Sequence, residues 1–465
     1  MGTKTAVLGS QRGSALGVVL ILAFVMLATV AAMFEIGAQD ASLAARNEDS
    51  VQAFFLADGG LSEGVQWLTA QSGPPGGTDL IEPLGSDPVA AGEGTYYVTI
   101  QPDAGNPFDL RKEYTITSTA TVGNKTRTLV REATTQSFAR YIYFTDLECM
   151  AGSGTPIWFV SADALNGPVH TNGHIHIMGD PYFGGMVTSS WGGPGDSDPS
   201  HSPTLVYYND GHNYVETRRL NNAPYDEPTF DAGCRLGSTW IDFPAYLDEV
   251  EAMAQNGGIH LTGNYKVKLS RSVSGSRQYG YVSYKPYRGG SWTDVEISSF
   301  NGILFVDGNV KLDGILDGDL TVGAAKDVLI MDDVVYRDAD PVLGPNEGCD
   351  DILGIVAEWN IRIKNNDANS DGCNIHAHMM ALGTSFKADD YNVGGPRGTL
   401  TVHGGIVQEY RGPVGTGYLH GGQVVINNGY AKNYNYDPRF ATDQPPGYLT
   451  TGAYELMAWH EVGCD

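Results

Sequence analysis

Residues 11–38, QRGSALGVVLILAFVMLATVAAMFEIGA, set the N-terminal architecture of this chain. No charged residue occurs from Ser14 to Phe34, and this run matches the roughly 20 apolar residues that a helix needs to cross a bilayer. Lys4 and Arg12 precede it without an acidic residue, so the positive-inside rule keeps the N-terminus in the cytoplasm. The sequence therefore predicts a transmembrane helix, with the rest of the chain outside the cytoplasm.

A helical pattern continues beyond the apolar run. Between residues 35 and 70, apolar side chains recur at intervals near 3.6, which predicts an amphipathic helix. The apolar positions are Leu43, Val51, Phe54, Phe55, Leu61, Val65 and Leu68. Gly59 and Gly60 weaken the pattern by about 1 kcal/mol each relative to alanine. QSGPPGG, residues 71–77, ends the helix.

Three kinds of N-terminal segment contain an apolar helix of this length: a cleaved secretory signal, an uncut anchor and the N-terminal helix of a pilin-type subunit. Signal peptidase could cut after Val30-Ala31-Ala32 and release a soluble protein that begins at Met33. An uncut anchor would keep Met1. Neither alternative explains why the helical pattern persists past the apolar run, so the pilin-type interpretation is favoured.

The N-terminus resembles that of type IV pilin-like proteins, and in particular the PilX-like minor pilins. Three features carry the resemblance: a basic leader ending in Arg12-Gly13, the aliphatic helix, and QAFFLADGGL at residues 52–61. The resemblance implies cleavage by prepilin peptidase between Gly13 and Ser14, anchoring in the inner membrane, and packing with other pilin subunits. The chain departs from major pilins at the fifth mature position, where Val18 replaces the glutamate that aligns subunits in a filament.

Three segments after the helix alternate apolar and polar residues and are rich in Thr, Val and Tyr, as half-buried strands are. They are residues 94–101, 112–122 and 125–136. Gly123-Asn124 separates the last two as a tight turn. A long N-terminal helix on antiparallel strands is the pilin layout, so we expect a pilin-like α+β module.

The sequence pattern changes beyond residue 138, where short strand-like segments alternate with Gly, Asn and Asp. In residues 302–336, Asp-Gly pairs separate short apolar runs. The runs are too short for ordinary hairpins, but this spacing suits the turns between successive strands of a β-solenoid. Similar segments follow at 353–363, 375–386 and 399–408. One helix is expected in PAYLDEVEAMAQNGG, residues 244–258, with Asp242 as its cap. The pattern predicts an all-β, parallel β-helix-like (solenoid) domain.

This larger region is similar to a family of uncharacterised bacterial domains found behind PilX-like N-termini. The most specific parts are NGPVHTNG, residues 166–173, and the YDPRF and PPG segments within residues 436–447. The resemblance implies co-occurrence with pilus or secretion machinery and implies no known activity. The expected parts are a leader at 1–13, a helix at 14–71, an antiparallel β segment at 72–137 and a β-solenoid domain at 138–465.

Charge and composition exclude several classes of function. The net charge of −26 argues against nucleic acid as a partner, because a phosphate backbone would repel the chain. Five cysteines are widely spaced without a CxxC pair, which excludes a zinc ribbon or a thioredoxin-like motif. The 25 tyrosines and seven tryptophans fit either a face that binds surface glycans or the capped ends of a solenoid.

A candidate calcium site lies in DANSDG, residues 367–372. Asp367, Asn369 and Asp371 offer oxygen ligands at alternate positions, as in the first half of a calcium loop, and glycine allows the turn. The twelfth position is His378 instead of glutamate, so another loop would have to donate oxygens. A solvated turn is the alternative.

Two histidine pairs have the i,i+2 spacing that can share a transition metal. The pairs are His174 with His176 and His376 with His378. No carboxylate or cysteine completes an obvious set beside either pair. We therefore expect stacked or hydrogen-bonded histidines at both places.

Fragments of a polygalacturonase-like signature also occur, at Asp332-Asp333 and Arg362-Ile363-Lys364. The order of these fragments does not match the family's signature. In that family a glycine-flanked histidine lies between the two fragments, whereas His403 follows both. Adjacent acidic residues on a strand also point to opposite faces. We expect a non-enzymatic structural subunit, a minor or tip component of a type IV pilus or related secretion filament. The alternatives are a surface adhesin or carbohydrate-binding protein, and a polysaccharide-active enzyme.

Overall fold

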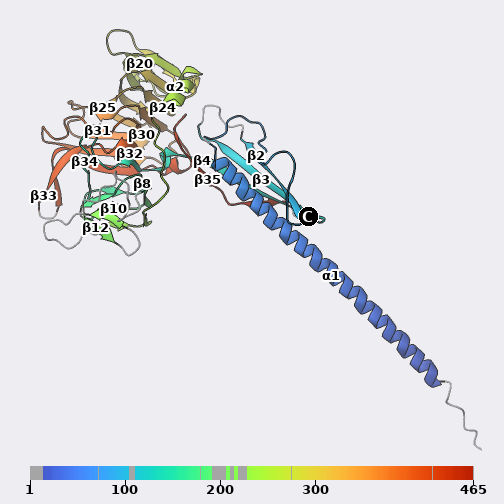
Figure 1. Cartoon of the computed structure of the whole chain (residues 1–465). Helices are drawn as coiled ribbons and strands as arrows, with labels where there is room; N and C mark the ends of the chain where they lie inside the picture. Colours follow the sequence, from blue (N-terminus) through green and yellow to red (C-terminus); the bar gives the residue numbers. More distant parts are fainter. Residues whose placement is uncertain are drawn as a thin grey trace, which may run out of the picture. The chain divides into compact units, whose positions relative to one another are not determined.

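The computed structural model forms two compact units (Figure 1). It describes residues 14–71, 73–103, 110–178, 180–190, 206–209, 214–217, 228–273, 275–420 and 423–463. The described residues of unit 1 come from Met1–Asp103, Tyr114–Ala133 and Leu456–Asp465. Those of unit 2 come from Ala104–Glu113 and Thr134–Glu455.

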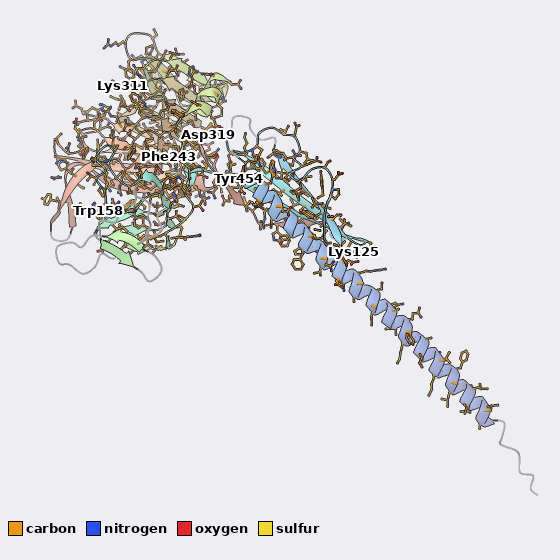
Figure 2. The ribbon with its side chains drawn as sticks, viewed as in Figure 1. Lys125, Trp158, Phe243, Lys311, Asp319 and Tyr454 are labelled. Carbon is orange, nitrogen blue, oxygen red and sulfur yellow. The ribbon has the colours of Figure 1, made fainter. Side chains whose placement is uncertain are left out.

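Unit 1 begins with a single uninterrupted helix, α1 (Ser14–Thr69), of 56 residues. Side chains from residue 15 to residue 48 are exposed, and those of the apolar run project from the helix without covering (Figure 2). By length and composition, α1 is long and apolar enough to cross a membrane. The predicted helix over residues 14–71 agrees with these bounds to within two residues.

The C-terminal half of α1 packs on an antiparallel sheet through a face of small residues and two leucines. Ala53, Ala57, Leu61 and Leu68 are fully buried at helical spacing, with Gly60 and Gly64 on the same side. The predicted stripe of large side chains is wrong in part. Val51, Phe55 and Leu43 are more than half exposed. Small residues face the sheet because they let the helix axis approach the strands closely.

The sheet of unit 1 contains β1 (Val89–Ala91), β2 (Gly94–Pro102), β3 (Glu113–Val122) and β4 (Lys125–Ser137) in that order. β1 pairs with β2, and β2 with β3, in antiparallel register. Gly123, whose φ is +56°, makes the turn between β3 and β4. The bounds of β2, β3 and β4 lie within one residue of the three predicted strands.

The far end of the chain joins the same sheet. β36 (His460–Val462) pairs antiparallel with β4. Arg127 on β4 forms a two-pronged ion pair with Glu461 and donates to the Ser50 hydroxyl of α1 at 2.8 Å. Trp459 packs edge-on against Phe54 of α1, with ring centroids 5.5 Å apart. The β-solenoid domain predicted over residues 138–465 differs from the structure at its end, because residues 456–463 group with unit 1.

Ten strands of unit 2 form one parallel ladder, in which each strand pairs with the next. In spatial order they are β15 (Cys234–Arg235), β11 (Val187–Ser189), β8 (Val169–Thr171), β5 (Tyr143–Leu147), β32 (Pro396–Tyr410), β30 (Cys373–Ala381), β28 (Ile352–Ala357), β24 (Asp319–Ala324), β22 (Ile303–Asp307) and β16 (Ile259–Thr262). Aligned residues form a buried apolar stack along the ladder: Leu304, Val322, Ile355, Met379, Ile406, Tyr143, Val169, Val187 and Cys234.

The chain enters this ladder in its middle. From β5 it steps through β8 and β11 to β15, and then crosses to the opposite end at β16, from which β22 to β32 lead back to β5. Residues 236–247 make the crossing. The Asn172 amide bonds both main-chain groups of Ile241 at 2.7 and 3.1 Å, and the Leu247 N–H donates to Glu358 at 3.2 Å. One extended segment therefore spans most of the ladder.

Helix α2 (Asp248–Gln255) follows the crossing segment. Leu247 occupies its N-cap position without a capping side chain, so the prediction of Asp242 as the cap is wrong. The helix begins late because the preceding residues have to cross the ladder in extended form. It packs against β16 and β22, with Val250, Met253 and Ala254 buried.

Further parallel pairings flank the main ladder. One set is β17 (Tyr265–Leu269), β23 (Val310–Leu316), β25 (Val328–Tyr336), β29 (Ile361–Ile363) and β31 (Phe386–Ala388). Another is β34 (Gln423–Tyr436), β7 (Ala164–Leu165), β10 (Tyr182–Phe183) and β14 (Thr229–Phe230). Antiparallel partners are β20 (Tyr281–Pro286) with β21 (Thr293–Glu296), and β33 (Gly415–His420) with β34.

The remaining described strands are short. They are β6 (Phe159–Val160), β9 (His176–Met178), β12 (Val206–Asn209), β13 (Tyr214–Thr217), β18 (Ser272–Val273), β19 (Ser276–Arg277), β26 (Ala339–Asp340) and β27 (Gly344–Pro345). A longer strand, β35 (Thr450–Leu456), has seven residues. Three single turns of 3-10 helix occur at Phe138–Arg140, Ile297–Ser299 and Pro438–Ala441. Unit 2 is thus a large β-rich body in which parallel pairing dominates.

Candidate functional site

The predicted processing site lies at the start of α1. Ser14 is the first residue of the helix, and Gly13 lies outside the described residues. Val18, at the fifth mature position, is exposed on the helix surface. The cleavage prediction therefore stays a prediction, carried by the resemblance of the sequence.

The three predicted calcium ligands do not face the same way. Asp367 and Asp371 are exposed, whereas Asn369 is buried and its amide nitrogen donates to the main-chain oxygens of Ile330 and Lys364 at 3.2 and 3.1 Å. The amide of Asn369 thus supports the fold of its own loop. Calcium binding at this loop stays a prediction.

The buried histidines are engaged with their neighbours. His378 contacts the Tyr448 hydroxyl through Nδ1 at 2.7 Å and the main-chain oxygen of Tyr141 through Nε2 at 2.9 Å. Burial lowers the pKa of His378 to about 4, so its imidazole is neutral near pH 7. The rings of His174 and His176 pack with centroids 5.7 Å apart. His378 is therefore hydrogen-bonded as expected, whereas the rings of His174 and His176 are tilted at 54° and not stacked.

The polygalacturonase-like fragments take part in local contacts. The Asp333 carboxylate accepts the N–H of Asn374 at 2.7 Å, and Arg362 pairs with Asp327 at 2.9 Å. His403 contacts the main-chain oxygen of Val342 through Nε2 at 2.8 Å. Asp333 lines a groove that neither Arg362 nor His403 reaches. The structure therefore does not gather these residues into one site.

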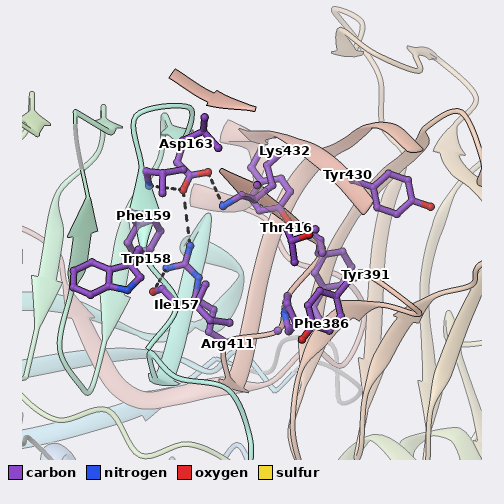
Figure 3. A pocket seen from close by; sticks show the side chains of 18 of the residues that line it. Ile157, Trp158, Phe159, Asp163, Phe386, Tyr391, Arg411, Thr416, Tyr430 and Lys432 are labelled. Carbon is purple, nitrogen blue, oxygen red and sulfur yellow. Dashed lines mark hydrogen bonds and ion pairs between the residues drawn. The ribbon is translucent and has the colours of Figure 1, made fainter. Parts of the chain in front are cut away.

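One pocket of unit 2 combines aromatic walls with charged groups (Figure 3). Its volume of about 520 Å³ lies within the range of small-molecule sites. The segment around β6, the end of β32, and the β33–β34 hairpin enclose it. Its aromatic walls include Tyr143, Trp158, Phe159, Phe386, Tyr391 and Tyr430.

Four charged side chains form a connected network at this pocket: Asp163, Arg411 and Lys432 line it, and Glu148 is buried behind Arg411. Arg411 donates to Glu148 at 2.8 Å, and their side chains are only 5% and 1% exposed. Asp163 accepts from Lys432 at 2.6 Å and from the N–H of Val160 at 2.9 Å, and lies 4.0 Å from Arg411 (Figure 3). Two cations thus balance two anions. A network in which every charge is paired is tolerated in a core, whereas an unpaired member would be strongly destabilising.

Aromatic rings pack against the Arg411 guanidinium. Its central carbon lies 3.9 Å from the ring centre of Phe159 and 5.5 Å from that of Tyr143, which places a cation over π faces. Burial lowers the pKa of Lys432, and the neighbouring Asp163 opposes that shift. Because the charges cancel, the pocket favours a neutral ligand with apolar faces over an ion.

The sequence did not single out this pocket. Glu148, Asp163, Arg411 and Lys432 come from four separate segments, and none lies in a recognisable motif. They meet because β34 and β5 pair with successive parts of one edge of β32, residues 396–404 and 406–410, while β30 pairs with the opposite edge. In the sequence, each of these residues appears only as a charged residue beside an apolar strand. That pattern does not indicate which opposite charge the residue pairs with.

Residues 109–191 match a family described as a domain of unknown function (DUF4900), and this range contains the strands from β3 to β11. No curated protein matches the chain. The crystal structure of the competence-associated pilin ComZ from Thermus thermophilus is similar at 13% identity, over 89% of this chain and 97% of that chain, with a TM-score of 0.31. A score this low does not establish a common fold.

Proposed function

We propose that the chain is a membrane-anchored, pilin-like subunit of the PilX-like minor type. The division of α1 supports this proposal best: one half is apolar and exposed, and the other is packed on an antiparallel sheet. A helix exposed in this way has to bury its apolar side chains in lipid or against other helices. The partners would be the inner membrane, prepilin peptidase and other pilin subunits.

Unit 2 would act as an extracytoplasmic head without enzymatic activity. The continuous parallel ladder and its internal apolar stack support its classification as an irregular β-solenoid. A head of this bulk would clash along a closely packed filament, so it suits a minor or tip component of a type IV pilus or related secretion filament. Its role would be mechanical.

Processing at Ser14 tests the proposal. Wild-type protein recovered from cell envelopes should begin at Ser14, and a Gly13→Leu variant should keep Met1, because the resemblance assigns the cut to the Gly13–Ser14 bond. N-terminal sequencing together with intact mass measures both. Gly17→Ala is the control, since a methyl group at Gly17 meets no atom within 4 Å, and it should be processed normally.

Two outcomes would contradict the proposal. A protein that begins at Met33 would be a soluble secreted protein cut by signal peptidase. A wild-type chain that keeps Met1 would be an uncut anchor. Either result would exclude pilin-type processing while leaving the fold of unit 2 as described.

A second candidate function, carbohydrate binding by the head, is favoured by the aromatic pocket. Sugars present apolar faces to aromatic rings and hydroxyls to polar groups, and the half-buried Trp158 and Tyr391 line the same pocket as the Asp163–Lys432 pair. The balanced charge of the pocket favours a neutral saccharide. Such a protein would serve as a surface adhesin.

Replacing Trp158 by alanine should weaken binding of a neutral oligosaccharide at least about tenfold, because one stacking surface is lost. A panel of neutral and acidic oligosaccharides, titrated against the full-length protein in detergent, measures this effect. Trp240→Ala is the matched control, since Trp240 is exposed and does not line the pocket. Equal affinities of the two variants, or preference for acidic sugars, would contradict this assignment.

A further inference from the structure

Three potential metal ligands converge on the surface of unit 2, away from the aromatic pocket. They are Glu251 of α2, His260 of β16 and Asp307 at the end of β22. The Nε2 atom of His260 lies 3.0 Å from Oδ1 of Asp307 and 3.3 Å from Oε1 of Glu251. All three ligand atoms lie within 4.8 Å of one another. The cluster therefore joins α2 to two neighbouring strands.

Hydrogen bonding alone accounts poorly for this convergence. An imidazole Nε2 carries at most one hydrogen, directed along one line, so it cannot make good bonds to two carboxylates at once. A tetrahedral zinc ion with bonds of about 2.0–2.1 Å would instead separate neighbouring ligand atoms by roughly 3.3 Å. The observed separations of 3.0 and 3.3 Å are close to that value.

Surrounding side chains hold each ligand in place. The ring of His260 stacks on Phe305 of the paired strand, with an interplanar angle of 6°. Gln255 donates to Oε1 of Glu251 at 2.8 Å, and the hydroxyl of Thr262 donates to Oδ2 of Asp307 at 3.3 Å. Contacts of this kind orient ligands in known metal sites.

The neighbourhood also carries an excess of negative charge. Burial raises the pKa of Glu358, and the charges of Asp248, Glu251 and Asp307 raise it further. Within the described ranges, no lysine or arginine forms an ion pair with Glu251 or Asp307. A bound divalent cation would offset this repulsion.

We propose that Glu251, His260 and Asp307 bind a divalent transition-metal ion of the zinc class. One imidazole nitrogen and two carboxylate oxygens match the ligands that zinc takes, and a fourth position stays open to water. The ion would fasten α2 to β16 and β22. This site is independent of the pilin proposal, since none of its residues belongs to α1 or its sheet.

Titration of the metal-stripped, full-length protein in detergent tests the site. Zinc chloride should bind with one strong site per chain, and Co²⁺ in its place should give the intense visible absorption of a tetrahedral centre. His260→Gln should weaken zinc binding at least roughly 100-fold and abolish the cobalt spectrum, since even the loss of a supporting residue weakens such sites 10–100-fold. Asp307→Asn should act in the same direction.

His460→Gln is the matched control, because His460 is an exposed histidine of unit 1 and should leave both signals unchanged. Circular dichroism checks that each variant is folded. The proposal is overturned if folded wild-type protein binds no zinc. It is equally overturned if folded His260→Gln binds zinc as the wild type does, or if the wild-type cobalt complex gives only the weak spectrum of a six-coordinate ion.

Discussion

Replacing Arg411 by methionine should lower the free energy of unfolding of unit 2 by about 3–5 kcal/mol. The substitution leaves the carboxylate of Glu148 in the core, where 1% of its side chain is exposed, without its 2.8 Å partner. It also removes the cation that lies over Phe159. Hydrogen exchange of the β5 and β32 amides measures the change, since these strands flank the network.

A rescue experiment separates the unpaired charge from lost packing. Adding Glu148→Gln to Arg411→Met should restore a large part of the lost stability, because a buried pair removed as a whole is far less harmful than one left half-paired. If the double variant is as unstable as the single one, packing of the guanidinium dominates, and the charge explanation is wrong.

Arg337→Met serves as the matched control on the surface. Arg337 pairs with Asp317 at 2.9 Å, but its side chain is 47% exposed, so its loss should lower stability by about 1 kcal/mol or less. Equal effects of the two arginine substitutions would show that burial of the network has no special role in stability.

The parts of the fold that depend on local pattern could be predicted from the sequence. The uncharged run, the 3.6-residue periodicity and the proline-glycine stop predict α1 to within two residues. Alternation of apolar and polar residues predicts β2, β3 and β4 to within one residue. These signals lie within a few residues of the structure that they determine.

Properties that depend on distant partners could not be predicted in this way. No local pattern indicates that the chain enters the ladder at β5, because that order depends on which of many similar strands pair. The capping residue of α2 was misplaced for a related reason, since the length of the crossing segment is set by the ladder it spans. The Arg411 network and the Glu251–His260–Asp307 cluster could not be predicted for the same reason, since their members come from separate segments of the chain.

Hydrophobicity was also a poor guide to which face of α1 meets the sheet. The predicted stripe contains Leu61 and Leu68, which are buried. It also contains Val51 and Phe55, which are 53% and 65% exposed, and it counts Gly60 as a weakness in the helix. In the structure Gly60 and Gly64 lie against the strands. Close packing here requires side chains of small volume. A hydrophobicity scale ranks side chains by apolarity and not by volume, so it does not identify this face.

Replacing Gly60 by leucine should therefore destabilise the packing of α1 on its sheet by about 3 kcal/mol. A Cβ atom at Gly60 would lie 2.3 Å from Oγ of Ser118 and 2.9 Å from Cδ2 of Tyr96, so even the first added carbon forces α1 or the facing side chains of the sheet to shift. Amide exchange in the C-terminal half of α1 should become roughly 100-fold faster, which matches that loss at 1.4 kcal/mol per factor of ten.

The adjacent glycine provides the control for this prediction. A Cβ atom at Gly59 meets nothing within 4 Å, so Gly59→Leu should gain up to about 1 kcal/mol from better helix propensity and slow exchange in the same segment. The two variants add the same side chain one residue apart, and only contact with the sheet distinguishes them. If both speed exchange equally, the close approach of α1 to β2 and β3 is not what holds this half of the helix.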